Sequence, residues 1–312
     1  GFYLCSNLFA LTLPLLGYLA YKGSWLCRAL WGVVLADYVV PLRMPGLWMR
    51  WCLLTNDAAG KNAYFNAKVI AEGEFRKDRN YLVCYHPHSL FGIGYNLMTV
   101  HLLEKYGIET LFTGADVVRH LPILRRILTW WGYTPVSAGA MKRNLQRPWP
   151  QNTLMLLPGG ISEMFYGLEE EQIILRRRKG FCRIALETGA CLVPCYCMGA
   201  NQVYKRWFGP RSLMAKISSA LRTSLVLWTD RFGIPYGFMP CKTRMVMLIG
   251  TPIEVTKVAS PTKEQIDELQ ERYIQDLRSL FDRHKSEMGP EWAQKELYLE
   301  DEDPSAPRRK RD

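Results

Sequence analysis

Residues 81–89 read YLVCYHPHS and decide the fold. Five residues suited to a buried strand run directly into a turn that contains a proline. A helical pattern covers residues 90–106, and a second apolar run, residues 153–157, ends at the PGG of residues 158–160. Strands that alternate with helices in this way predict an α/β domain with a mixed, largely parallel sheet flanked by helices.

The same pattern continues toward the carboxyl terminus. Further strands are predicted over residues 173–175, 191–197 and 245–249. A short helix from Gly180 to Glu187 is ended by Gly189, a residue that favours the left-handed cap of a helix. Thr262 and Gln265 form a capping box at the start of a long amphipathic helix. These elements predict a single domain over residues 56–299.

The composition provides a sizeable core and a basic surface. Hydrophobic residues make up 48% of the 312 residues, which excludes a mainly disordered or fibrous chain. Forty Lys and Arg against 29 Asp and Glu give a net charge of +11, which favours a phosphorylated ligand, an acidic lipid or nucleic acid as partner. The basic residues lack the regular aromatic interleaving of a strand-binding groove, so no nucleic-acid partner is expected. Nine cysteines without a repeated CxxC framework predict reduced thiols in the cytosol and no metal site.

The N-terminal residues 1–55 are strongly apolar. Residues 2–21 contain no charged side chain, and a helix of that length spans about 30 Å, the thickness of a bilayer core. A second apolar stretch, residues 25–42, is interrupted by Arg28 and Asp37. We predict a transmembrane or re-entrant membrane hairpin, and the basic residues that follow it predict that the domain faces the cytosol.

Two other interpretations of this terminus stay open. A cleaved signal peptide is disfavoured because the stretch lacks a basic start and a small-residue cleavage site. A hairpin buried in the core is the minority alternative. The chain opens without methionine inside an apolar run, so we expect an incomplete N-terminus.

Three further segments are assigned by their pattern. Residues 300–312 are rich in charge and predict a disordered tail. Residues 121–131 and 211–228 are amphipathic, and the second places Leu213 and Trp228 on one helical stripe. Each of these two stretches is expected to lie either in a membrane interface or against the core.

The chemistry is predicted at the turn His86-Pro87-His88-Ser89, where the first strand ends. Open α/β sheets bind ligands beyond the carboxyl ends of their strands. Proline stiffens the turn, and an imidazole is suited to accept a proton from a hydroxyl near neutral pH. The alternatives are a polar surface turn and a metal-chelating pair, and the pair is disfavoured because no acidic or cysteine cluster stands beside it.

Two later motifs strengthen the catalytic interpretation. PGGISE, residues 158–163, repeats the strand-then-turn arrangement and ends in Glu163, a carboxylate able to orient an imidazole or bind a hydroxyl. The basic run RRRK, residues 176–179, precedes the helix that begins at Gly180, an arrangement suited to a phosphate group. A solvated glutamate and a solvated basic loop are the corresponding alternatives.

Three segments together resemble one known family. They are YHPHSLFGIG at residues 85–94, PGGISE at 158–163 and RRKGFCRIALETGACLVPCYCMGANQVYKRW at 177–207. In this order they are similar to the type-2 diacylglycerol acyltransferase family, which includes monoacylglycerol and wax-alcohol acyltransferases. The resemblance extends over nearly all of the predicted domain, and it also implies the N-terminal hairpin and a fold like that of glycerolipid acyltransferases.

The resemblance implies an activity and a location. The reaction is transfer of an acyl group from acyl-CoA, the co-substrate, to the free hydroxyl of a neutral glyceride. It implies no metal and no other cofactor. The implied location is the endoplasmic reticulum membrane, with the catalytic domain facing the cytosol, or the surface of a lipid droplet, so the lipid bilayer is an expected partner.

This chain departs from the family pattern at several positions. Ser89 replaces the glycine that is common in animal members, and residues 198–201, MGAN, replace a frequent Phe-Gly-Glu-Asn. The aspartate that follows the histidine of glycerolipid acyltransferases is missing, because Phe91 or Ile93 stands in its place. We therefore assign the role of that aspartate to Glu163.

The motifs and the resemblance lead to one mechanism. His88 is expected to take the proton from the glyceride hydroxyl, Glu163 to hold the imidazole, and His86 to act as a supporting or alternative base. The residues expected to bind the substrates, through turn amides at the oxyanion or basic side chains at the CoA phosphates, are Ser89, Gly159, Gly160, Arg176, Arg178, Lys179, Gly180, Phe181 and Arg183.

The acceptor is chosen on family grounds alone. Diacylglycerol is expected, with monoacylglycerol or a long-chain alcohol as the alternative. A membrane-tethered lipid-binding protein without catalytic activity is the rival from another functional class, and product formation from labelled acyl-CoA separates the two. The sequence leaves a homo-oligomer open.

Overall fold

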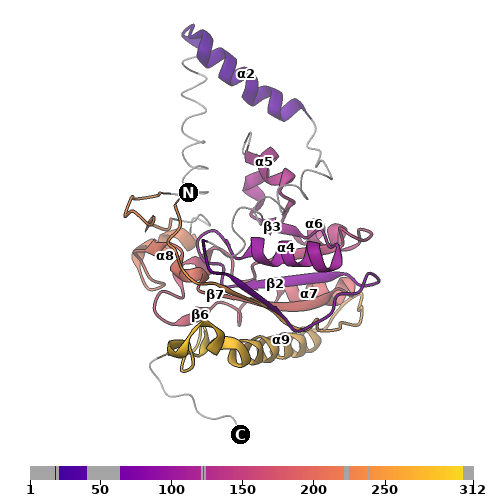
Figure 1. The fold of residues 1–312 in the computed structure, drawn as a ribbon. Helices are drawn as coiled ribbons and strands as arrows, with labels where there is room; N and C mark the ends of the chain where they lie inside the picture. The colour runs from indigo at the N-terminus through magenta and orange to yellow at the C-terminus, as the bar shows by residue number, and fades with distance from the viewer. Residues whose placement is uncertain are drawn as a thin grey trace.

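A seven-stranded sheet forms the centre of the molecule, in the order β1-β10-β7-β2-β5-β3-β4 (Figure 1). The structure, a computed structural model, describes residues 18, 21–40, 64–120, 122, 124–220, 225–237 and 239–304. The strands are β1 (Lys68–Ala71), β2 (Tyr81–His86), β3 (Leu111–Gly114), β4 (Tyr133–Pro135), β5 (Thr153–Leu156), β7 (Cys191–Met198) and β10 (Val246–Ile249). β7 and β10 pair antiparallel and the other neighbours pair parallel, which confirms a mixed, largely parallel sheet.

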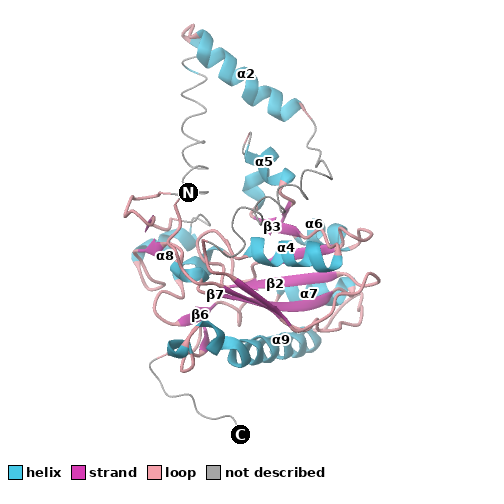
Figure 2. Ribbon diagram, viewed as in Figure 1, coloured by secondary structure: helices cyan, strands magenta, loops and turns pink. Residues whose placement is uncertain are grey.

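The sheet is buried on both faces because its strands carry apolar side chains at successive positions. On β2, Leu82 and its alternates pack into a core with α6, α7 and α9, whereas Val83 and its alternates pack on the other face with α4. Figure 2 shows helices on both sides of the sheet. The covering helices are α4 (Tyr95–Tyr106), α6 (Ala138–Leu145), α7 (Gly180–Thr188) and α9 (Lys263–His284).

Several predicted elements are confirmed and others are wrong. The runs predicted as strands at residues 81–85, 153–157, 191–197 and 245–249 are β2, β5, β7 and β10. The helix predicted from Gly180 is α7, and the capping box at Thr262 opens α9. Three short strands of the main sheet, β1, β3 and β4, were not predicted, nor were the short strands β8 (Lys205–Arg206), β9 (Trp228–Thr229) and β11 (Leu297–Leu299) outside it. The strand predicted at residues 173–175 is instead β6 (Glu171–Ile173), which pairs with β11 (Leu297–Leu299) outside the main sheet.

The predicted helical stripe from Leu213 to Trp228 is also wrong. Helix α8 covers Leu213–Ala220, and Trp228 lies in the short strand β9 (Trp228–Thr229). The Trp228 side chain is buried, and its indole N–H donates to the carbonyl of Gly237 at 3.0 Å. This tryptophan is therefore held by the turn that follows it in the chain, which a helical periodicity does not represent.

A buried carboxylate ties α2 (Trp25–Val39) to α5 (Leu124–Trp130). Asp37 Oδ2 accepts from Arg125 Nε at 2.8 Å, and its Oδ1 accepts from Arg126 Nε at 2.6 Å. An unpaired carboxylate in an apolar helix would be costly in lipid. Asp37 is instead neutralised by two guanidinium groups from a helix far along the chain, which fixes the position of α2.

The predicted membrane hairpin stays a prediction. Residues 2–17, 19 and 20 of its first leg lie outside the described residues, and its second leg contains α2, a helix of 15 residues. Among the helices that the structure describes, none combines the length and the apolar character needed to cross a bilayer.

The basic loop before α7 is pinned by two side chains from the C-terminal part of the chain. Glu300 accepts hydrogen bonds from three successive amides, residues 175–177, at 2.8–3.2 Å. The buried amide of Gln270, on α9, donates to the carbonyls of Leu175, Arg176 and Arg178. The predicted disordered tail, residues 300–312, is thus ordered at its start, and residues 305–312 lie outside the described residues.

Replacing Gln270 with alanine should destabilise the protein, because three carbonyls of one loop would lose the buried donor that they share. The expected loss is about 1–3 kcal/mol in the free energy of unfolding, measured by denaturant titration of the purified chain. Glu268→Ala is the matched control, since Glu268 lies exposed on the same helix; its change should stay within about 0.5 kcal/mol. Equal stability of the two variants would contradict this account of the loop.

Candidate active site

A cavity of about 520 Å³ lies at the carboxyl ends of four neighbouring parallel strands, β2, β5, β3 and β4. This is the edge at which open α/β sheets bind ligands, and the volume suits a small-molecule site. Its walls come mainly from the segments that follow these strands. The lining residues are His88, Thr113, Gly114, Ala115, Val136, Leu156, Leu157, Gly160, Ile161, Ser162, Arg178 and Ser218.

The two histidines of the turn face different surroundings. His86 is the last residue of β2 and is fully buried, with its ring centroid 6.3 Å from that of Tyr273 on α9. Beyond Pro87, His88 is half-buried and lines the cavity. Pro87 therefore separates a histidine packed against α9 from a histidine that lines the cavity.

Glu163 connects the histidine turn to the basic loop. It lies fully buried in the short turn η2 (Ile161–Phe165), where its Oε1 accepts from the His88 amide at 2.6 Å and its Oε2 from the Ile174 amide at 3.0 Å. Its Oε1 also lies 3.6 Å from Nδ1 of His86. Burial on its own would raise the pKa of Glu163, but His86 and the two amide donors hold it below its ordinary value. Glu163 is therefore a buried, ionised carboxylate.

Glu163 contacts the histidine turn differently from the expected arrangement. It binds the backbone amide of His88, whereas the ring Nδ1 of His88 lies 3.0 Å from the carbonyl oxygen of Ser89. A carbonyl accepts from Nδ1–H, which leaves Nε2 with the free lone pair of a base. The Ser89 carbonyl, held by a backbone with φ of 48°, thus takes the orienting role that the sequence assigned to Glu163.

The environment favours the neutral form of the His88 imidazole. Burial lowers the pKa of His88 below its ordinary value, and the nearby Arg206 cation lowers it further, whereas the Ser89 carbonyl and Glu163 act in the opposite direction. A base must be unprotonated to accept a proton, so this direction suits general-base chemistry.

The two glycines of PGGISE make room for this geometry. A Cβ on Gly159 would lie 1.8 Å from Oε2 of Glu163, so a side chain here is incompatible with the position of the carboxylate. Gly160 lines the cavity with a φ of 61°, and its amide donates to the carbonyl of Leu157 at 3.1 Å. Because that amide is already engaged, Gly160 does not offer the oxyanion donor expected from the sequence.

The basic loop sends one of its three candidate side chains into the cavity. Arg178 lines the cavity and donates from one terminal nitrogen to the carbonyl of Gly159 at 3.2 Å. Arg176 pairs with Glu271, and Lys179 pairs with Asp267 at 2.5 Å, both partners lying on α9. Arg178 and His88 thus line the same cavity, whereas Arg176 and Lys179 pair with carboxylates on α9.

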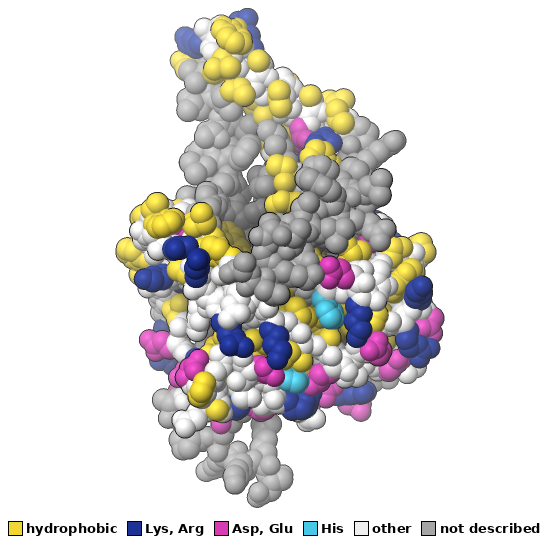
Figure 3. All heavy atoms as spheres, viewed as in Figure 1, with side chains coloured by type: hydrophobic (Ala, Val, Ile, Leu, Met, Phe, Trp, Pro, Cys, Tyr) yellow, Lys and Arg dark blue, Asp and Glu magenta, His cyan; other side chains and the backbone are white. Residues whose placement is uncertain are grey.

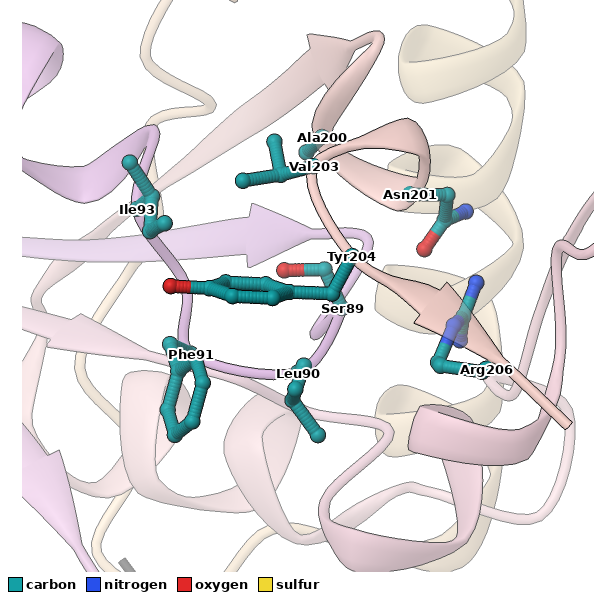
Figure 4. Close-up of a pocket in the computed structure, with 9 residues that line it drawn as sticks. All are labelled: Ser89, Leu90, Phe91, Ile93, Ala200, Asn201, Val203, Tyr204 and Arg206. Carbon is teal, nitrogen blue, oxygen red and sulfur yellow. The ribbon is translucent and has the colours of Figure 1, made fainter. Parts of the chain in front are cut away.

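The other expected substrate-binding residues lie away from this cavity. Phe181 is buried against Tyr273, with ring centroids 5.1 Å apart, and belongs to the core. Gly180 and Arg183 are exposed on α7. Ser89 lines a separate, smaller pocket with residues 200–206 (Figure 4). Their predicted roles in binding remain predictions.

Several residues of the site were not predicted from the sequence. Ser162 lies inside the PGGISE motif and could have been predicted from it. Thr113 lies on β3, a strand that was not predicted from the sequence. Arg206 acts on His88 from a segment more than a hundred residues away; it lies inside the quoted segment 177–207, but nothing in that segment indicates its contact with the histidine turn. Among the described residues, no group of three or more His, Cys, Asp and Glu side chains is placed to hold a metal ion.

Comparisons with known proteins place the chain in a family. The family model described as diacylglycerol acyltransferase matches residues 28–299. Diacylglycerol O-acyltransferase 2 of Dictyostelium discoideum is 30% identical over 238 residues, which cover 72% of this chain and 71% of that protein. Diacylglycerol O-acyltransferase 2-like protein 6 of Bos taurus is 29% identical over 265 residues, covering 78% and 75%.

A solved structure is also similar. The crystal structure of the 1-acyl-sn-glycerophosphate acyltransferase PlsC from Thermotoga maritima aligns with 90% of this chain and 96% of its own, at 16% identity and a TM-score of 0.45. The family model and the relatives confirm the resemblance carried by the three motifs. By these matches, the chain belongs to the diacylglycerol acyltransferase family and is an acyltransferase.

Proposed function

We propose that this enzyme transfers an acyl group from acyl-CoA to the hydroxyl of diacylglycerol, with His88 as the general base. The observation that carries the proposal is a half-buried imidazole whose Nδ1 is held by the Ser89 carbonyl and which lines a cavity shared with Arg178. The names of the similar proteins support diacylglycerol as the acceptor. Monoacylglycerol and long-chain alcohols are the alternative acceptors.

The reaction follows from the free nitrogen of His88. Nε2 takes the proton of the acceptor hydroxyl as its oxygen attacks the thioester carbonyl, and a tetrahedral oxyanion forms. Collapse of this intermediate expels the CoA thiolate, which takes from the imidazolium the proton that the acceptor hydroxyl gave up. General-base assistance of this kind typically contributes about 10²–10⁴-fold in rate.

Arg178 is the cation that the proposal places at the CoA phosphates. It approaches the cavity from the loop before α7, and its buried Nε has no hydrogen-bond partner among the described residues. A guanidinium group binds phosphate oxygens through charge-assisted hydrogen bonds. Arg176 and Lys179, already paired with carboxylates, are weaker candidates for this role.

The acceptor is insoluble in water, so the proposal includes the bilayer as a partner. Large apolar side chains are exposed on α2, including Trp25 and Leu30, and on α8, including Leu213 and Ile217. Figure 3 shows hydrophobic side chains gathered along α2 and over α8, whereas charged side chains are frequent on the lower part of the same face. We propose that this apolar side faces the endoplasmic reticulum membrane or a lipid droplet.

The function is tested by an acyl-CoA assay with diacylglycerol, monoacylglycerol and a long-chain alcohol in parallel. The purified wild type should form labelled triacylglycerol, and His88→Ala should lower kcat/KM by about 10²–10⁴-fold, because the base is lost. His284→Gln is the matched control, since His284 pairs with Glu72 outside the cavity. Full activity of the His88 variant would disprove the assigned base and point to His86.

Gly159→Ala should disable the enzyme without touching a reacting group. The new Cβ would overlap Oε2 of Glu163 and force the carboxylate from the His88 amide. Displacing a catalytic group by about 1 Å typically costs about 10²-fold in rate. Gly139→Ala is the control, since an added Cβ there meets nothing nearer than 3.4 Å. A fully active Gly159 variant would show that the Glu163 contact is dispensable.

Charge reversal at Arg178 should act on one substrate more than on the other. In Arg178→Glu, the apparent KM for acyl-CoA should rise at least about tenfold, because a cation at the phosphates becomes an anion, and the KM for diacylglycerol should change much less. Lys77→Glu is the control, because Lys77 is exposed before the amino end of β2. An equal rise in both KM values would contradict a specific role at the phosphates.

A further inference from the structure

Arg206 is buried, and its guanidinium group donates hydrogen bonds to the turn that carries Glu163. It belongs to the short strand β8 (Lys205–Arg206). One terminal nitrogen donates to the carbonyls of Met164 and Tyr166 at 2.6 and 2.9 Å, and the other donates to the carbonyl of Gly167 at 3.1 Å. These three carbonyls directly follow Glu163, so one guanidinium fixes the backbone on which that carboxylate stands.

A second side chain of the same segment packs against this backbone. A Cβ on Gly167 would lie 2.1 Å from the side-chain amide nitrogen, Nδ2, of Asn201, so the Asn201 side chain packs directly on the glycine. Gly167 has a φ of 67°, a conformation that favours glycine. In Figure 4, Asn201 and Arg206 occupy the same end of the small pocket. The segment 201–206 therefore restrains the turn through both hydrogen bonds and packing.

The charge of Arg206 is enclosed by protein. Burial lowers the pKa of Arg206 to about 10, and the buried Glu171 opposes this shift, so the group stays cationic at neutral pH. Glu171 in turn accepts a hydrogen bond from the hydroxyl of Tyr196 at 2.6 Å. A cation surrounded by protein is poorly screened by water and salt, so it acts on neighbouring groups over a longer distance.

We propose that Arg206 is a positioning residue for acyl transfer: it locks the Glu163 turn, and its fixed positive charge disfavours a second positive charge on His88. The inference rests on the proposed role of His88 as the base. In this arrangement Arg206 does not contact either substrate. It keeps the contact between Glu163 and the His88 amide in place, and it adds to the burial that keeps the imidazole of His88 neutral.

The groups around His88 determine the equilibrium between its neutral and protonated forms, and Arg206 shifts this equilibrium toward the neutral form. From η2, the Glu163 carboxylate favours the imidazolium, and the Ser89 carbonyl favours it too. Arg178 lines the same cavity, and His86 stands across the Glu163 carboxylate. Removing the charge of Arg206 leaves the two groups that favour the imidazolium less opposed, so the protonated form of His88 becomes easier to populate.

The test compares three variants of the full chain in the acyl-CoA and diacylglycerol assay over a range of pH. Arg206→Met removes the charge and the three hydrogen bonds. Arg206→Lys keeps the charge, but a single ammonium cannot reproduce the fork of the guanidinium. Lys205→Met is the matched control, because Lys205 is the exposed neighbour of Arg206 on β8.

The two proposed effects have separate readouts. In Arg206→Met, kcat should fall at least about tenfold as the turn loosens, and the acidic limb of kcat/KM should move to higher pH. The sign follows because that limb reports the pKa of the base in the free enzyme, and loss of a neighbouring cation raises it. In Arg206→Lys, kcat should fall while the acidic limb stays at its wild-type position. Lys205→Met should match the wild type in both.

Two results would overturn the inference. One is an Arg206→Met variant with the wild-type acidic limb, and the other is an Arg206→Lys variant with wild-type kcat. Should Arg206→Met fail to show a cooperative unfolding transition, Arg206→Lys alone decides, through its kcat. An active wild type combined with full activity of His88→Ala would instead refute the proposed base, so the two failures are distinguishable.

Discussion

The architecture of the site depends on the buried carboxylate of Glu163. A charge removed from water is costly unless hydrogen bonds replace its hydration. Glu163 meets this requirement with two backbone amides, those of His88 and Ile174, which belong to segments far apart in the chain. Satisfying one charge therefore joins the turn after β2 to the segment that leads into the basic loop. The absence of a side chain at Gly159 leaves the space this arrangement needs.

In this arrangement, different groups hold the backbone and the ring of His88. The carboxylate fixes the backbone of the histidine turn, while the Ser89 carbonyl sets the orientation of the His88 ring. The His88 ring is thus oriented by a neutral group and not by an adjacent anion. An anion bonded directly to the ring would stabilise the imidazolium strongly. Here burial and Arg206 outweigh the anion, and the imidazole stays neutral.

The sequence predicted the parts of the fold that carry continuous apolar runs. Strands such as β2 and β7 are buried on both faces, so their composition alone identifies them. β3 and β4 read LFTG and YTP, and their few residues resemble loops. The same limit applies to the site: motifs located His88, Glu163 and Arg178, but the carboxylates that occupy Arg176 and Lys179 lie on α9, about ninety residues away. Pairing over such distances leaves no local signal.

The net positive charge of the chain does not equal the positive charge available to a ligand, because buried carboxylates pair with part of it. Asp37, Glu163 and Glu300 each hold together segments distant in sequence, through guanidinium groups or backbone amides. Arg125 and Arg126 both pair with Asp37, so the net charge is larger than the number of cations free to bind a ligand. Arg206 is likewise committed to carbonyls. Arg178 lines the cavity, and its Nε has no hydrogen-bond partner within the described part of the chain, so this side chain is a better guide to a site for an anionic ligand than the net charge of the whole chain.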